Sequence, residues 1–236
     1  MQDRYTGDIG DYVKYGLLRA IADGRSLGVA WYLFPDEGHN ADGRHIDYLQ
    51  KPNLWRAHDP ELFDSLKRIV EEDRRKVTDI EELGILGAAR FSSECLSAPD
   101  LTPAQRRIWR SRWFENVKAG LLGCDVVFAD PDNGLCDDER FRAGSVKDWK
   151  KIPLSEAKAL AQGRTAVIYH HNTRRKGGHE LEIAYWIGQL GANTLALRWR
   201  AYGSRTFFVI NPAPDVCERL RKFALEWGAK AELYYQ

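Results

Sequence analysis

The sequence Asp-Pro-Asp-Asn-Gly at positions 130–134 places two carboxylates and a side-chain amide directly after the apolar run 126–129. The run is short and β-rich, which predicts a buried strand. Proline lacks a ladder donor, and Asp, Asn and Gly favour turns, so the strand must end here. Ligands of open α/β sheets bind at the carboxyl ends of strands. We therefore predict catalytic roles for Asp130, Asp132 and Asn133, the alternative being an ordinary strand-ending turn.

Two further acids and a lysine stand among glycines near the start of the chain, at Asp8, Asp11 and Lys14. One acid can cap the helix that is expected to begin near Tyr12, because Asp is a favoured N-cap residue. Capping explains a single Asp and leaves the second Asp and the lysine without a role. We therefore predict that all three contact a ligand.

The first expected core strand, residues 27–33, leads into a loop over residues 34–45 that is crowded with polar side chains. Polar loops that leave a core strand commonly carry ligand-binding groups, although a solvated loop is the alternative. The predicted substrate-binding residues of this loop are Asp36, His39, Asn40, Asp42 and Arg44. His39, Asp42 and His45 carry groups that can bind a metal, but their spacing matches no known metal signature, so no metal is predicted.

A second polar cluster follows the expected strand 165–169 and begins with His170, His171 and Asn172, which are predicted to bind substrate. Neighbouring residues of an extended chain point to opposite faces, so one histidine can face the site while the other packs. Three cations come next and suit phosphate contacts; they are Arg174, Arg175 and Lys176.

The expected helix 102–121 carries a second set of cations together with tryptophans. These cations are Arg106, Arg107 and Arg110. A basic helix with aromatic residues can follow a phosphate backbone, and a solvated helix face is the alternative. Together with residues 174–176, these arginines form the predicted nucleic-acid-binding set.

The order of the expected elements, with strands alternating with helices, predicts an α/β fold with a mostly parallel, Rossmann-like sheet and helices on both faces. Residues 193–201 and 206–210 are expected to form a hairpin or adjacent strands. No repeat or linker interrupts the 236 residues. We predict one domain with a helical insertion at about residues 46–115.

Composition excludes several classes of partner and site. With 35 basic and 34 acidic residues the formal charge is +1, so any nucleic-acid contact must come from local patches. The four cysteines have no CxxC spacing, which argues against zinc or redox motifs. No apolar run approaches 20 residues and no leader peptide is visible, so a cytoplasmic protein without a membrane partner is expected. The oligomeric state is left open.

Three stretches resemble the class I methyltransferase fold and, more closely, the bacterial 23S ribosomal RNA adenine-N6 methyltransferases. Residues 5–14 are similar to the family's Gly-Asn-x-x-Asp-x-x-Lys opening, with Asp8 in place of Asn. Residues 126–133 are similar to its strand and Asp-Pro-Pro-Tyr catalytic turn, and residues 207–212 to its late strand with an Asn-Pro stop. The resemblance implies S-adenosylmethionine as a donor and an adenine base as the acceptor.

Two departures from the family pattern argue against methyl transfer. The donor loop of the family is a small glycine-rich turn, whereas residues 35–45 are long and filled with polar side chains. In the catalytic turn, Asp132 and Asn133 replace the second proline and the base-stacking aromatic residue. Loss of that ring removes roughly 1–3 kcal/mol of stacking.

The resulting hypothesis is a base-flipping enzyme without a cofactor, with DNA favoured over RNA as its partner. Paired carboxylates suit hydrolysis of an N-glycosidic bond, because a carboxylate can stabilise an oxocarbenium-like sugar or activate water. We thus expect a DNA glycosylase. The polar loop suits a bulky, hydroxyl-rich modified base of the kind found in phage DNA, so a role in antiviral defence is expected. The alternatives are an S-adenosylmethionine-dependent adenine-N6 methyltransferase on RNA or DNA and a non-catalytic nucleic-acid-binding module.

Overall fold

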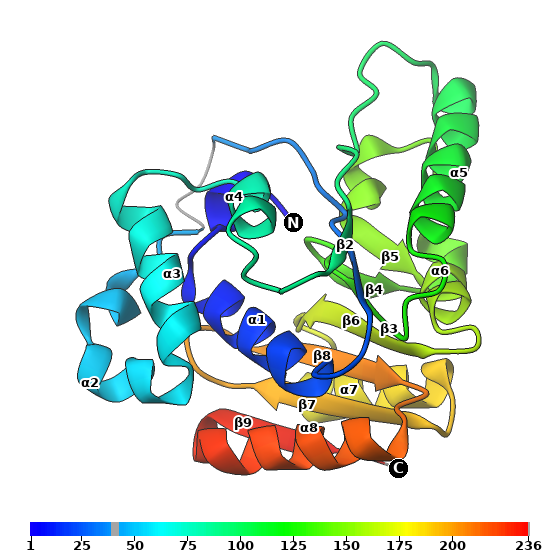
Figure 1. Ribbon diagram of the computed structural model, residues 1–236. Coiled ribbons are helices and arrows are strands. Elements are labelled where there is room, and N and C mark those ends of the chain that lie inside the picture. Colours follow the sequence, from blue (N-terminus) through cyan, green and yellow to red (C-terminus); the bar gives the residue numbers. More distant parts are fainter. Residues whose placement is uncertain (39–42, 236) are drawn as a thin grey trace.

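The computed structural model describes residues 1–38 and 43–235 and contains a seven-stranded sheet flanked by helices (Figure 1). Across the sheet the strands are β2 (Arg90–Ser92), β1 (Leu27–Ala30), β3 (Val126–Ala129), β6 (Thr165–His171), β8 (Arg205–Ile210), β7 (Thr194–Trp199) and β9 (Ala231–Tyr234). Strands β2, β1, β3 and β6 are parallel neighbours, and β8 pairs antiparallel with both β6 and β7. The prediction of a mostly parallel, Rossmann-like α/β sheet is confirmed.

Helices cover both faces of the sheet, as expected. One core contains side chains of α1 (Ile9–Ile21), α3 (Pro60–Glu71) and α8 (Pro214–Trp227) packed on strand residues such as Val167 and Phe207. The other core contains side chains of α5 (Pro103–Gly120), α6 (Leu154–Leu160) and α7 (Gly178–Leu190) packed on residues such as Ile168 and Phe208. Successive residues of β6 and β8 thus enter opposite cores, which is the period-2 pattern of a sheet buried on both sides.

The segment 46–115 adds helices outside the sheet and also supplies one of its edge strands. Besides α3, it contains α2 (Pro52–Trp55), α4 (Val77–Glu82), the strand β2 and the first part of α5. Helix α3 ends after Glu71, at a turn where Asp73 has a positive φ of 55°. Strand β2 is too short and too polar to be recognised from the sequence.

The segment after β3 holds a small second sheet. Strand β4 (Gly134–Cys136) pairs in parallel with β5 (Lys151–Pro153). Three residues are too few to give an alternating pattern, so this sheet could not be recognised from the sequence. It anchors both ends of residues 137–150 beside β3. Among the described residues, no helix is long and apolar enough to cross a membrane.

The chain changes direction across the sheet between β1 and β3. From β1 it first adds β2 on one side and then returns to place β3 on the other. The carboxyl ends of β1 and β3 therefore border a topological switch point, where open α/β sheets bind ligands.

Candidate functional site

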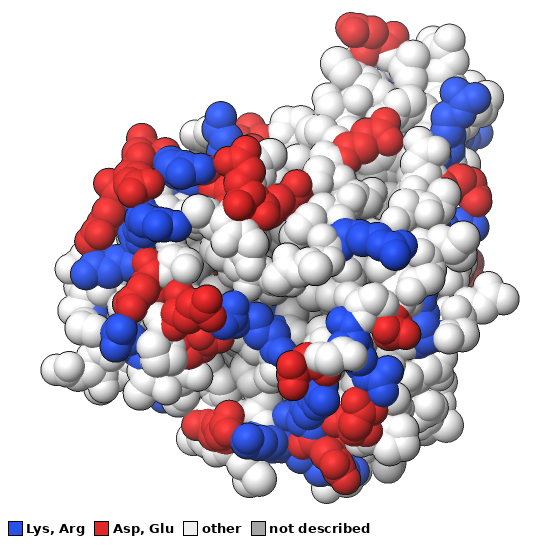
Figure 2. All heavy atoms as spheres, in the orientation of Figure 1, with Lys and Arg blue, Asp and Glu red and all other residues white. Residues whose placement is uncertain are grey.

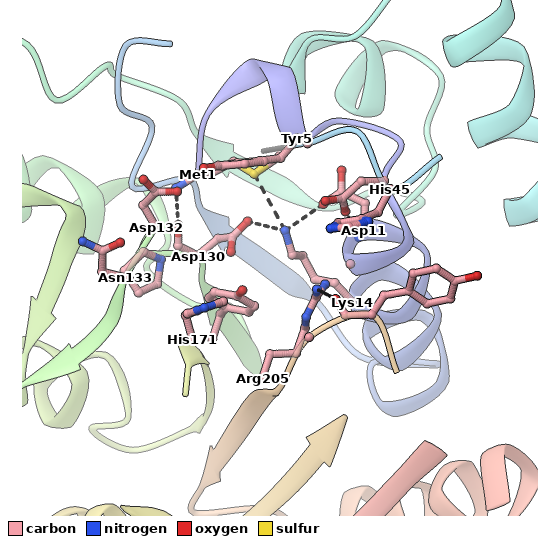
Figure 3. Close-up of a pocket in the computed structure, with 17 residues that line it drawn as sticks. Met1, Tyr5, Asp11, Lys14, His45, Asp130, Asp132, Asn133, His171 and Arg205 are labelled. Atoms are coloured by element: carbon pink, nitrogen blue, oxygen red, sulfur yellow. Dashed lines mark hydrogen bonds and ion pairs between the residues drawn. The ribbon is translucent and has the colours of Figure 1, made fainter. Parts of the chain in front are cut away.

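A polar cavity of about 320 Å³ opens at the carboxyl end of β3, between the start of α1 and the sheet (Figure 3). Its lining comes from the beginning of the chain, the catalytic turn, the end of β6 and the start of β8. The lining residues are Met1, Tyr5, Asp8, Gly10, Asp11, Lys14, Gly43, His45, Asp130, Pro131, Asp132, Asn133, Tyr169, His171, Tyr202, Gly203 and Arg205. The two sequence clusters at residues 8–14 and 130–133 thus meet in one place.

The centre of the cavity wall is an ion cluster around Lys14. Its Nζ lies 2.8 Å from Oδ1 of Asp11 and 2.7 Å from Oδ2 of Asp130. Side-chain exposure is 6% for Lys14, 1% for Asp11 and 2% for Asp130, so solvent screens these charges very little. The second oxygen of Asp11 accepts a hydrogen bond from the backbone N–H of Gly7. The cluster therefore ties the start of α1 to the end of β3.

Two carboxylates share a single ammonium group, and this arrangement affects the pKa values of Lys14 and Asp11. Burial alone would lower the pKa of Lys14, but Asp11 and Asp130 outweigh burial and raise it above its ordinary value. Burial raises the pKa of Asp11 to about 6, against the opposing effect of Lys14 and with a contribution from Asp8. Lys14 therefore stays charged, and Asp11 takes up a proton in mild acid.

Local structure explains how the start of the chain reaches the cavity. Asp8 caps α1, because its Oδ1 accepts a hydrogen bond from the N–H of Asp11 at 3.0 Å. Asp8 also lines the cavity, so the capping and the ligand-contact interpretations of this residue are compatible. The guanidinium of Arg75 donates hydrogen bonds to the carbonyls of Arg4, Thr6 and Gly43 and holds the two cavity-forming loops together.

The second acid of the turn is held by a different set of partners. Oδ2 of Asp132 accepts a hydrogen bond from Gln2 Nε2 at 2.8 Å and lies 3.6 Å from Nζ of Lys150, which is also paired with Glu37. Asn133 is exposed at the rim, with its backbone N–H bonded to the carbonyl of Lys150. All three residues predicted to be catalytic line the cavity, Asp130 in its floor and Asn133 at its edge.

The two histidines at the end of β6 point to opposite faces of the sheet. His171 lines the cavity. His170 is fully buried; its Nδ1 accepts from the N–H of Leu135 at 3.0 Å and its Nε2 lies 3.1 Å from Glu182. With Nδ1 accepting, Nε2 carries the proton and donates to Glu182. The predicted substrate contact of His170 is therefore wrong, since both ring nitrogens are occupied in the core.

Hydrogen bonds from His170 and Thr173 outweigh burial and lower the pKa of Glu182 to about 2. Glu182 accepts from both the backbone and the hydroxyl of Thr173. This network fixes the loop after β6, and through Leu135 it also holds the strand that follows the catalytic turn. We regard His170 and Glu182 as positioning residues.

Other residues of the predicted substrate-binding set lie outside the cavity lining. Asp36 is exposed and accepts a hydrogen bond from the N–H of Arg4, and Arg44 is exposed. Asn172 is buried and accepts from the hydroxyl of Thr206 at 2.8 Å. His39, Asn40 and Asp42 fall outside the described residues.

Sequence analysis missed several side chains that line the cavity, among them Tyr5, Tyr169, Tyr202 and Arg205. It considered His45 only as a ligand of a metal. Tyr169 and His171 are two residues apart on β6, so a strand extended to residue 171 would have placed both on one face. His171 pairs directly with Arg205 across the β6–β8 ladder, so their side chains share a face as well. No local pattern marks Arg205 or Tyr202 in the sequence.

The predicted nucleic-acid-binding residues do not form one surface. Arg110 is a core residue, 1% exposed, paired with Glu156 at 2.6 Å and stacked on Trp113. The prediction that Arg110 contacts nucleic acid is therefore wrong, because its helix face turns toward α6. Arg106 donates hydrogen bonds to the carbonyls of Ala98 and Pro99, and Arg107 is exposed.

The three cations after β6 lie at the same edge of the sheet as the cavity. Arg174 and Lys176 are exposed, whereas the guanidinium of Arg175 lies 3.6 Å from the ring centre of Tyr185. In Figure 2, basic and acidic side chains alternate over the visible face, without one continuous area of positive charge among the residues drawn. The described part of this face therefore offers no continuous basic surface for a phosphate backbone.

The space directly beyond β1 is filled by protein. Trp31 and Tyr32 follow the strand, are fully buried and enter the two opposite cores. The amino group of Met1 donates hydrogen bonds to the carbonyls of Tyr32 and Asp130, at 3.1 and 2.9 Å. Within the described residues, no group of three or more His, Cys, Asp or Glu side chains is placed to hold a metal ion.

Comparison with solved structures finds the same fold in protein LPL1258 from Legionella pneumophila, a crystal structure described with the family model DUF519. The two chains are 10% identical over 97% of this chain and 96% of that chain, with a TM-score of 0.50. No protein-family model matches this chain, and no curated protein matches it. The comparison therefore establishes the overall fold and leaves the chemistry to be argued from the cavity.

Proposed function

We propose that this chain is a DNA N-glycosylase, which hydrolyses the bond between a base and its sugar after the base has been extruded into the cavity. The observation that carries the proposal is the buried carboxylate of Asp130, held beside Lys14 in the floor of a polar cavity at the switch point of the sheet. Such a carboxylate can stabilise positive charge that develops on a sugar.

The reaction needs few groups. The bond between C1′ and the base nitrogen breaks with its electron pair leaving on the base, and the sugar becomes oxocarbenium-like. Water then adds to C1′, and its proton neutralises the departing base. Asp130 or Asp132 faces the positive sugar or accepts the proton of the water, in the way that carboxylates serve glycoside hydrolysis. No cofactor is required for these steps.

The lining of the cavity suits a flipped nucleotide. The side chains of Tyr5, Tyr169 and Tyr202 supply aromatic surface on which a base can stack, and stacking is worth roughly 1–3 kcal/mol per base. The exposed cations Arg174 and Lys176 lie at the same sheet edge and can contact the phosphates beside the extruded base. As an enzyme acting on DNA, the protein is proposed to work in the cytoplasm.

An adenine methyltransferase is the second candidate. The Asp-Pro turn that resembles the adenine-N6 methyltransferase family lies at the end of a central strand, beside the switch point of the sheet. Two features argue against it. Buried Trp31 and Tyr32 follow β1 where a glycine-rich turn would let a cofactor approach closely, and the carbonyl of Asp130 already accepts a hydrogen bond from Met1.

The experiment that tests the proposal is incubation of the protein with genomic DNA from ordinary and base-modified phages, with and without S-adenosylmethionine. Mass spectrometry then measures released bases, and alkaline cleavage measures abasic sites. A free base and abasic sites that do not depend on the donor are expected. A gain of one methyl group that requires the donor would replace the proposal with methyl transfer. If neither product forms on any of these DNAs, hydrolysis is rejected and a binding module remains.

A further inference from the structure

Arg205 is a buried cation without a carboxylate partner. It is the first residue of β8, its exposure is 7%, and it forms no ion pair within 4.0 Å among the described residues. Its hydrogen bond runs from Nη2 to the carbonyl of Tyr202 at 3.2 Å, and Nε is buried without a partner. A buried guanidinium with unused donors is costly, so such a group commonly marks a ligand site.

The surroundings of Arg205 hold its guanidinium against the start of α1. A Cβ atom built on Gly10 would lie 1.8 Å from Nη1 of Arg205, so only glycine at position 10 allows this approach. That Cβ position on Gly10 would also lie 2.8 Å from Oδ1 of Asp8. Figure 3 shows the side chain of Arg205 reaching from β8 toward Lys14 and His45, with His171 beside it. Arg205 lines the cavity, so its guanidinium lies within reach of a ligand bound there.

The charge of the cavity decides which acceptor fits these donors. Among the described lining residues, Asp8, Asp11, Asp130 and Asp132 face two side-chain cations, Lys14 and Arg205, and Asp132 also has a partner outside the lining, Lys150. Lys14 is already paired with two carboxylates. A phosphate would meet the excess of acids at short range, which costs free energy in a poorly solvated site. A neutral group with hydrogen-bond acceptors avoids that repulsion.

We infer that Arg205 recognises the extruded base by an edge that presents two adjacent acceptors, namely O6 and N7 of guanine or O2 and N3 of cytosine, modified or not. Guanidinium has five donors in a rigid fork and no acceptor, and its bidentate contact with guanine is the commonest specific base contact. Adenine presents an acceptor beside an amino donor on each edge, so one N–H of Arg205 would meet another N–H.

The inference rests on the proposed function, from which it takes the assumption that the ligand is an extruded base. It adds which class of base the cavity accepts. It also separates the two candidate functions, because an adenine-N6 methyltransferase must accept adenine. A binding experiment tests it without requiring catalysis. The ligands are 1-methylcytosine, 9-methylguanine, 9-methyladenine and 1-methylthymine, in which the methyl group replaces the sugar, and binding is measured by NMR titration.

The wild-type protein is expected to bind the cytosine or the guanine ligand roughly tenfold more tightly than adenine, which is within the range for one bidentate contact. Arg205→Lys keeps the charge but loses the fork, so it should remove this preference. Gly10→Ala should do the same by displacing the guanidinium. Arg200→Met is the matched control, because Arg200 is an exposed residue at the end of β7 that pairs with Glu232 and lies outside the cavity lining.

Binding of adenine as tight as that of cytosine and guanine would overturn the inference. It would also fail if Arg205→Lys weakened all four ligands equally, or if none of the ligands bound. Base release is measured separately on DNA. If the protein binds these bases selectively but releases no base from DNA, the inference holds and the proposed glycosylase activity is rejected. If it releases bases without selective binding, the glycosylase activity holds and the inference is rejected.

Discussion

Lys14 and Asp130 lie 116 positions apart in the sequence, and their side chains meet in an ion pair of 2.7 Å in which both groups are almost completely buried. The pair joins the first turns of α1 to the carboxyl end of β3. It keeps a charged carboxylate at the floor of the cavity, where an isolated one would be strongly disfavoured. This contact brings two polar segments, one at the start of α1 and one after β3, together in one site.

Replacing Asp130 by Asn should abolish base release while leaving DNA binding intact. The amide keeps the size of the side chain but cannot stabilise a cationic sugar or accept a proton from water. We expect a loss of roughly 10²–10⁴-fold in the rate of release. Single-turnover assays of released base and a DNA-binding titration measure the two properties. Asp64→Asn, at an exposed residue paired with Arg56, is the control. Unchanged release by Asp130→Asn would remove this residue from the mechanism.

Lys14→Met should destabilise the fold, because it leaves Asp11 and Asp130 buried without their cation. Breaking one side of a buried ion pair costs about 3–5 kcal/mol in the free energy of unfolding. Urea denaturation monitored by tryptophan fluorescence measures the change. Adding Asp11→Asn to Lys14→Met should recover part of the loss. Lys118→Met, at an exposed pair on α5, should change stability very little, and an equally small effect of Lys14→Met would contradict the role assigned to the cluster.

The raised pKa of Asp11 predicts a dependence of stability on pH. The pKa is about 6 in the folded protein and 3.8 ordinarily, so the folded state binds more protons between these values. Stability contributed by this group is therefore lost as pH rises from about 4 to about 6. Urea denaturation across this range should show the decline in the wild type and a smaller one in Asp11→Asn. Parallel curves for the two proteins would exclude Asp11 as the titrating group.

Gly134→Ala should disrupt the catalytic turn. Gly134 has a φ of 82°, and a Cβ atom there would lie 2.4 Å from Nδ1 and 2.6 Å from Cα of His170. The left-handed conformation costs about 1–2 kcal/mol for alanine, and overpacking typically adds about 1–3 kcal/mol. A lower melting temperature and weaker base release are expected together. Gly163→Ala has a similar φ of 72° but open space around it, so it separates backbone strain from the clash with His170.

Neutralising the loop after β6 should weaken DNA binding in a salt-dependent way. Arg174→Ala combined with Lys176→Ala removes two exposed cations, so the slope of log K against log salt should decrease by about 1.8 if each contacts one phosphate. Fluorescence anisotropy with a duplex measures this slope. Arg110→Leu, by contrast, should leave the slope unchanged and alter stability, because Arg110 is in the core. An unchanged slope for the double variant would remove this loop from the DNA interface.

The fold class and the position of the turn at residues 130–134 could be predicted from the sequence, because both depend on local signals. Apolar runs set the strands, and Pro131 and Gly134 end one of them beside Asp130 and Asp132. The Asp8 cap and the opposite directions of His170 and His171 follow from the same short-range rules of backbone geometry.

Which of the polar residues share a site depends on long-range packing and could not be predicted from the sequence. The contact of Lys14 with Asp130 depends on how α1 packs on the sheet. The burial of Arg110 depends on α6, since an arginine beside tryptophans can face solvent or the core with equal local propensity. Arg205 entered the site because β8 pairs in register with β6, and such long-range pairing has no trace in the residues next to it.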